Sequence, residues 1–148
     1  MIRQAQQQDI PEMVLLRIQF LNEVNDRQPP VGFAGELSQY FQRALADGSF
    51  SAWLAVEEGR IVATSGMCIH TVAPNYYNPS GKSAYILNMF TVPEARGRGL
   101  ASQLFARLLE EARERGCGKA SLHATEAGRM VYKKFGFAFT DDEMSLSL

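Results

Sequence analysis

The sequence has little of what metal-binding and disulfide-bonded proteins depend on. It holds only two cysteines, Cys68 and Cys117, and two histidines, His70 and His123. The cysteines fall in different expected elements, and there is no Cys-x-x-Cys motif or Cys/His cluster. We therefore expect no metal site and two reduced thiols rather than a disulfide.

The chain also lacks a long apolar run and a strong charge of one sign. No apolar stretch reaches the roughly 20 residues that a membrane-spanning helix needs, and residues 1–5 do not resemble the apolar core of a secretory signal. A net charge of −1 argues against a general nucleic-acid binder. These absences predict a cytoplasmic protein with no membrane or nucleic-acid partner. Its 148 residues predict one domain, residues 1–148.

One stretch in the second half carries the most distinctive pattern. An apolar run ends at Pro93, and the segment Arg96-Gly97-Arg98-Gly99 leads into a helical apolar stripe. Glycines can take a positive φ, and the first N–H groups of a helix are unpaired and favour an anion. The stretch therefore predicts a cradle for phosphate groups, to which Arg96 and Arg98 add positive charge.

The periodicity of apolar residues predicts the element order β-α-α-β-β-β-α-β-α-β. Strands are expected at residues 2–6, 51–57, 60–70, 82–92, 119–124 and 137–148, and helices at residues 9–25, 36–46, 99–115 and 126–135. Asp9, Pro11 and Glu12 match a capped helix start. Strands and helices alternate only in the second half, after a hairpin. This order favours an α/β (α+β) fold with a mixed sheet.

Two motifs resemble the signatures of a known family. Residues 96–101 (Arg-Gly-Arg-Gly-Leu-Ala) fit the Arg/Gln-x-x-Gly-x-Gly/Ala motif of the GNAT N-acetyltransferases, and residues 89–93 resemble the strand before it. Residues 131–137 resemble the second signature, a tyrosine four residues before Gly-Phe. The element order resembles that of the family over essentially the whole chain. The resemblance implies a mostly antiparallel central sheet of six to seven strands flanked by about four helices.

The resemblance implies acetyl-CoA as cosubstrate and assigns its contacts. The pantetheine arm would pair with the strand backbone at Met89, Phe90 and Thr91, and the diphosphate would lie on the N–H groups of residues 97–102. Thr125 occupies a position where many members carry an asparagine that touches the arm. The implied cofactor contacts are Met89, Phe90, Thr91, Arg96, Gly97, Arg98, Gly99, Leu100, Ala101, Ser102 and Thr125.

The resemblance also assigns a general acid and leaves the base open. Tyr132 would protonate the departing thiolate, although a half-buried packing role explains a helix tyrosine as well. Some protein-acetylating members carry a glutamate that acts as the general base where this chain has Ala120. Glu23 or Asp26 could attract the amine or take its proton, or they could be exposed helix charges. His123 could be a base through water, or a structural histidine.

The acceptor is the least determined part of the sequence. Asn88, His70, Tyr76 and Tyr77 could contribute to an acceptor pocket, and the turn-rich loop at residues 71–81 could close it. A closed pocket favours a small-molecule amine over a protein N-terminus or lysine. A non-catalytic acyl-CoA-binding regulatory domain is an alternative of another class. Dimers are common in the family, so the resemblance leaves a homodimer open.

Overall fold

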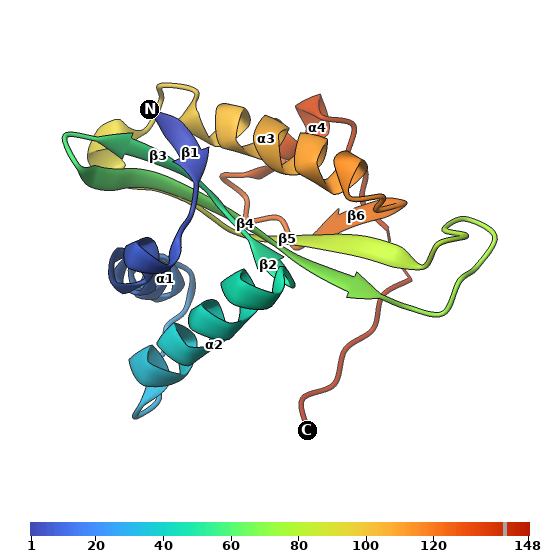
Figure 1. The fold of residues 1–148 in the computed structure, drawn as a ribbon, viewed down its shortest axis with the longest axis horizontal. Coiled ribbons are helices and arrows are strands. Elements are labelled where there is room, and N and C mark those ends of the chain that lie inside the picture. Colours follow the sequence, from blue (N-terminus) through green and yellow to red (C-terminus); the bar gives the residue numbers. More distant parts are fainter. Residues whose placement is uncertain (141) are drawn as a thin grey trace.

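A mixed sheet with helices on both faces forms the protein. The computed structural model describes residues 1–140 and 142–148. Helices α1 and α2 cover one face of the sheet, and α3 and α4 cover the other (Figure 1). The strands are β1 (Ile2–Gln4), β2 (Phe50–Ser51), β3 (Trp53–Glu57), β4 (Arg60–Thr71), β5 (Lys82–Thr91) and β6 (Lys119–Leu122). The helices are α1 (Ile10–Val24), α2 (Phe33–Asp47), α3 (Leu100–Glu114) and α4 (Arg129–Lys134).

The strand order explains where an opening can form. The order is β1-β3-β4-β5-β6, with β2 beside β4, and β5 pairs with β6 in parallel while the other described pairs are antiparallel. The parallel pairing ends at Ile86 opposite Leu122. Strand β5 continues to Thr91, whereas β6 ends at Leu122. The last part of β5 therefore has no β6 partner, and the mixed α/β architecture is confirmed.

Strand β5 contains a bulge just beyond this point. Its pairing with β4 shifts between Thr64 opposite Phe90 and Gly66 opposite Leu87, so β5 has one residue more than β4 there. Asn88 takes a left-handed conformation with φ of +58°, which asparagine tolerates better than most residues. The Thr64 hydroxyl donates to the Asn88 carbonyl oxygen at 2.9 Å. The carbonyl at the bulge is therefore satisfied in a buried position.

The bulge decides which side chains face each helix layer. Leu87 and Phe90 are three residues apart, yet both pack with the core under α1 and α2. Ile86 and Met89 pack with the core under α3 and α4. In a regular strand, residues three apart would face opposite sides. The bulge thus turns Met89 toward the α3 and α4 side.

The start of the first helix differs from the capping box expected there. The Asp9 side chain makes no capping bond to α1. Its carboxylate instead accepts two hydrogen bonds from Arg3, both 2.8 Å, and one from the Gln6 N–H at 2.7 Å. Glu12 accepts from the Ile61 N–H at 2.8 Å. The two carboxylates join the helix to the first strand and to the sheet, because these partners compete with the local cap.

The C-terminal part differs most from the expected elements. The helix predicted at residues 126–135 is limited to α4, and residues 137–140 and 142–148 contain no strand, while Asp141 lies outside the described residues. Met144, Leu146 and Leu148 alternate with serines, the pattern of a strand, but all three are exposed. Such a pattern stabilises a strand only when a partner buries its apolar face. The expected last strand is therefore wrong for this arrangement.

Candidate active site

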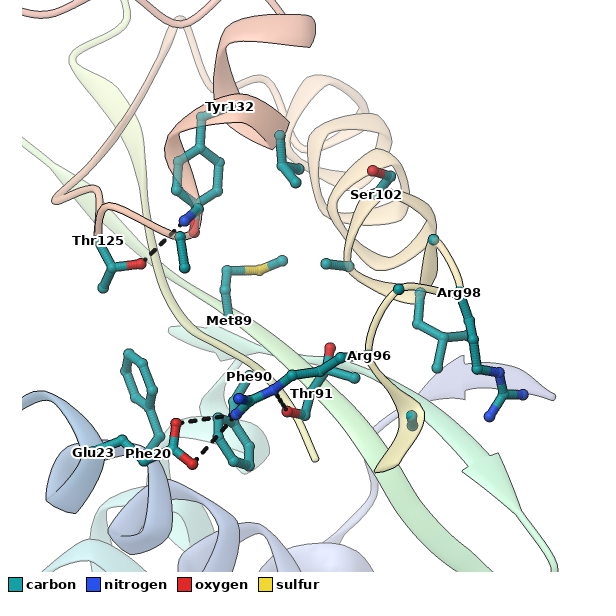
Figure 2. A pocket seen from close by; sticks show the side chains of 18 of the residues that line it. Phe20, Glu23, Met89, Phe90, Thr91, Arg96, Arg98, Ser102, Thr125 and Tyr132 are labelled. Carbon is teal, nitrogen blue, oxygen red and sulfur yellow. Dashed lines mark hydrogen bonds and ion pairs between the residues drawn. The ribbon is translucent and has the colours of Figure 1, made fainter. Parts of the chain in front are cut away.

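A cavity of about 450 Å³ lies where β5 extends beyond the end of its pairing with β6. Its walls come from the ends of α1 and β5, the glycine-rich turn, the first turn of α3, and the segment around α4 (Figure 2). Every cofactor contact implied by the resemblance lines this cavity, together with Tyr132 and Glu23. The sequence pattern did not single out the further lining residues Phe20, Val24, Ala95, Ala127, Gly128 and Val131. These residues carry ordinary core or turn patterns, so only the fold reveals their place.

The glycine-rich turn has the geometry of an anion cradle. Gly97 and Gly99 have φ of +74° and +78°, and Gly99 precedes the first turn of α3. No side chain caps this helix start, and its first turn carries no acidic residue. In residues 1–140 and 142–148, the N–H groups of Leu100, Ala101 and Ser102 have no acceptor. A Cβ added to Gly97 would meet no atom within 4 Å. Open space and unpaired donors together fit a diphosphate.

Arg96 joins the turn to α1 across the rim of the cavity. Its Nε donates to the Thr91 carbonyl oxygen at 2.9 Å, and its Nη2 lies 3.0 and 3.3 Å from the two Glu23 oxygens. Its guanidinium carbon lies 5.6 Å from the centre of the Phe90 ring. Figure 2 shows this side chain extending toward Glu23. The positive charge expected next to phosphate is therefore shared with a carboxylate in this arrangement.

Arg98 is also paired with a carboxylate. Its guanidinium forms a two-contact ion pair with Glu57 at the end of β3, and this pair lowers the pKa of Glu57 and raises the pKa of Arg98. Both side chains are exposed, so the pair contributes little to stability. The backbone N–H groups consequently supply the uncompensated positive potential of the cradle.

Tyr132 projects from α4 into the cavity on the side opposite the cradle (Figure 2). Its ring packs against Phe105 and Phe137, with centroid distances of 5.2 and 6.3 Å, and burial raises the pKa of its phenol. A Cβ added to Gly128 would lie 2.7 Å from the Tyr132 ring. The Gly128 N–H donates to the Thr125 hydroxyl at 3.3 Å. The turn before α4 thus leaves room for a protonated phenol and fixes its position.

His123 lies outside this cavity. Its Nδ1 is hydrogen-bonded to the Tyr85 hydroxyl, and its Nε2 lies 3.4 Å from the Glu143 carboxylate. It lines a second cavity of about 510 Å³, beside β6 and α4, that shares Tyr132 with the first. The histidine is largely exposed. Its role as a base stays a prediction, and that of Glu23 does too.

The residues expected around the acceptor do not form the expected pocket. The loop at residues 71–81 joins β4 to β5 and lies at the opposite end of β5 from the cradle (Figure 1). Tyr76 and Tyr77 are fully exposed at this loop, and His70 is exposed before it. Asn88 is only 2% exposed and does not line the cavity. A strand of ten residues separates this loop from the cradle, so the loop does not line the cavity of about 450 Å³, and its closure over an acceptor stays a prediction.

Three further properties concern the described residues. Within residues 1–140 and 142–148, no group of three His, Cys, Asp or Glu side chains is arranged to hold a metal ion. None of the helices described above is long and apolar enough to cross a membrane. Cys68 and Cys117 are both free thiols.

Comparison with known proteins identifies the family. The family model described as "Acetyltransferase (GNAT) family" matches residues 18–137. The chain belongs to the GNAT acetyltransferase family. A predicted acetyltransferase from Clostridium acetobutylicum, solved with acetyl-CoA, is 37% identical and has a TM-score of 0.93 over 99% of this chain and 95% of that one. A GCN5-related N-acetyltransferase from Ralstonia eutropha is 30% identical with a TM-score of 0.87, over 100% and 97% of the two chains.

Two relatives from Oryza sativa subsp. japonica have names more specific than that of the family. A probable glucosamine 6-phosphate N-acetyltransferase 2 is 35% identical over 92 residues, which span 62% of this chain and 54% of that protein. Glucosamine 6-phosphate N-acetyltransferase 1 is 28% identical over 131 residues, 86% of this chain and 78% of that protein. The chain thus spans about half the length of the first of these two relatives.

These findings confirm the fold, the family and the cosubstrate expected from the sequence. The protein is a GNAT acetyltransferase with acetyl-CoA as acetyl donor. The contacts of single residues with acetyl-CoA stay predictions, although the cradle and the cavity fit the ligand.

Proposed function

We propose that the protein transfers an acetyl group from acetyl-CoA to the primary amine of a small molecule by direct attack. One observation carries the proposal: the unpaired N–H groups at the start of α3 and the phenol of Tyr132 line the same cavity of about 450 Å³. The N–H groups of the cradle can bind the diphosphate of acetyl-CoA, and the phenol can donate a proton to the leaving thiolate. The names of the two rice relatives favour a small amine as acceptor.

Each part of the cavity has a separate task in this proposal. Acetyl-CoA supplies an acetyl group activated as a thioester. The N–H groups of residues 97–102 hold its diphosphate, and the β5 backbone at residues 89–91, which β6 does not reach, pairs with the pantetheine arm. Backbone N–H groups of β5 also polarise the reacting carbonyl.

Tyr132 acts as the general acid. Burial raises the pKa of its phenol above 10.0, so the proton is retained at neutral pH and is available to the sulfur as the thiolate departs. Two side chains remain candidates for removing the proton from the amine. Glu23 lines the cavity but is paired with Arg96, and His123 lies outside it beside Tyr85, which would require a water between histidine and amine.

The direct test is an activity assay with a panel of amines. The protein is incubated with acetyl-CoA and either small amines, lysine-containing peptides or peptides with a free N-terminus, and free thiol is followed. We expect turnover with a small amine. Turnover only with peptides would support a protein acetyltransferase, and CoA binding without turnover on the panel would support a regulatory acyl-CoA-binding domain.

A tyrosine pair tests the acid role. Tyr132→Phe should lower kcat by about 10² to 10⁴, the usual contribution of general acid catalysis, with little change in CoA affinity by calorimetry. Tyr76→Phe is the matched control, because this side chain is fully exposed at the far end of β5. Equal kcat values for the two variants would contradict the role assigned to Tyr132.

A further inference from the structure

An arginine occupies a position in α1 that would ordinarily be apolar. Arg17 lies four residues after the fully buried Met13 and three before Phe20, on the helix face that packs against the sheet. Its guanidinium carbon is 5.8 Å from the centre of the Phe20 ring. Burial lowers the pKa of Arg17 below its usual range. The helix thus carries a charged group into a partly dehydrated position.

The groups around Arg17 are hydroxyls and a thiol. Cys68 of β4 lies directly opposite Tyr85 of β5 in the strand pairing, and the Tyr40 hydroxyl of α2 is 3.2 Å from the Cys68 sulfur. These three groups are the titratable neighbours of Arg17, and none of them is a carboxylate. Burial raises the pKa of both tyrosines, so their phenols are neutral donors at pH 7.

The guanidinium of Arg17 has no hydrogen bond or ion pair with any residue in 1–140 or 142–148. In contrast, Arg3, Arg96, Arg98 and Arg115 each contact a carboxylate. A partly buried cation without a counter-charge is unfavourable for folding. Its position therefore suits an anion that binds from outside the chain.

The position of Arg17 relates this site to the reaction. Phe20, against which the guanidinium lies, is part of the cavity wall on the α1 side, while the cradle and Tyr132 belong to the α3 and α4 side. We propose that Arg17 binds an anionic oxygen group, a phosphate or a carboxylate, on the amine acceptor. Guanidinium groups bind such anions through paired N–H donors. This inference rests on the proposed function, because it assigns a substrate class to the same reaction.

A binding experiment tests the site without turnover. The melting temperature of the protein is measured against inorganic phosphate in the presence of saturating CoA, so that the cradle is already occupied. Phosphate should raise the melting temperature of the wild type, because a ligand of the folded state stabilises it. Arg17→Gln should remove the rise, and Arg60→Gln, an exposed arginine at the β3–β4 turn, should keep it. An equal rise in Arg17→Gln would overturn the proposal.

The variant Arg17→Met controls for the possibility that Arg17→Gln loses the phosphate response only because it folds poorly. Methionine keeps an apolar stem of similar length, and without phosphate this variant should melt at the same temperature as the wild type or higher, because an uncompensated charge is removed. Loss of the phosphate response in a variant of equal or higher stability supports the site. A retained response excludes it.

A kinetic experiment identifies the anion. Glucosamine 6-phosphate is compared with glucosamine, and β-alanine with ethylamine, in wild type and Arg17→Gln. We expect the preference in kcat/KM for the anionic member of one pair to fall roughly 10- to 100-fold, the range that charge-assisted hydrogen bonds supply. The pair that responds shows whether phosphate or carboxylate is bound.

The two failures are distinguishable. An unchanged preference in Arg17→Gln, with active enzyme, overturns the anion site and leaves the acetyltransferase reaction intact. Absence of turnover with every amine contradicts the proposed function, and the phosphate response in the melting experiment then decides the role of Arg17 by itself.

Discussion

Gly128 leaves the space that the Tyr132 phenol occupies. The variant Gly128→Ala tests whether this position of the phenol matters for catalysis. The φ of Gly128 is −84°, which alanine adopts without strain. The new methyl group would lie 2.7 Å from one ring carbon of Tyr132 and 3.1 Å from its hydroxyl oxygen. Ordinary contact begins at 3.4 Å, so the ring edge has to move by about 0.7 Å. The ring cannot retreat freely, since Phe105 and Phe137 pack against it.

The displacement should lower both the rate and the stability. A misplacement of about 1 Å in a catalytic group can cost about 10² in rate, so we expect kcat of Gly128→Ala to fall roughly 10- to 100-fold. Overpacking of this kind typically costs about 1–3 kcal/mol of unfolding free energy. The affinity for CoA, measured by calorimetry, should change little, because the cradle at Gly97 and Gly99 lies on the opposite wall.

Two controls separate displacement of the phenol from a general effect of the methyl group. Gly35→Ala adds a methyl within α2, where no atom lies within 4 Å, and should leave kcat unchanged while stability stays equal or rises by up to about 1 kcal/mol. In a Tyr132→Phe background, Gly128→Ala should add little further loss, because the acid is already absent. Unchanged kcat in the single variant, or full additivity in the double variant, would refute the reasoning.

The remaining predictions concern the cradle and the N-terminal ion pair. Gly99→Ala and Gly59→Ala both place a side chain at a positive φ, +78° and +77°, so each should lose about 1–2 kcal/mol of stability, but only Gly99→Ala should weaken CoA binding by calorimetry. Equal affinities would exclude the cradle. Asp9→Asn should cost about 1–3 kcal/mol at pH 7, because it removes the negative charge and one of the two oxygens that accept from Arg3. Arg3 lowers the folded-state pKa of Asp9, so this stability is present above the ordinary value of 3.8 and is lost as the pH falls through the lowered pKa. Chemical denaturation from pH 7 to pH 3 should therefore show the two proteins converging, and a constant difference would contradict the ion pair.

The parts of the site that are continuous in sequence could be predicted from it. The glycine-rich turn is local: two glycines at positive φ and the uncapped start of α3 follow each other within a few residues. Tyr132 was also recognisable, since its spacing from Gly136 and Phe137 is fixed along the chain. These elements depend on backbone conformation and helix periodicity, which short stretches encode.

The parts that depend on distant neighbours could not be predicted. Glu23 carried a visible charge, but its pairing with Arg96 joins residues 73 positions apart. Arg17 stood out in principle, as a charge within the apolar stripe of α1, but its meaning depends on Tyr40 and Tyr85 from other elements. The loop at residues 71–81 was rightly expected to be a loop, yet its distance from the site follows from the length and direction of β5.

The bulge in β5 has a consequence for how this cavity is encoded. The Asn88 side chain is buried, and its amide atoms have no hydrogen-bond partner among the described residues, so it contributes length and backbone shape more than contacts. Bulges bend the strand that carries them, and this one comes two residues after Ile86, the last β5 partner of β6. Deleting Asn88 would restore regular alternation between Leu87 and Phe90 while keeping each on its present face. Without the bulge, β5 would lose this bend next to the end of β6, and the space for the pantetheine arm would be narrower. The width of the site therefore depends on one extra residue in β5. Insertions and deletions would alter this feature more readily than substitutions.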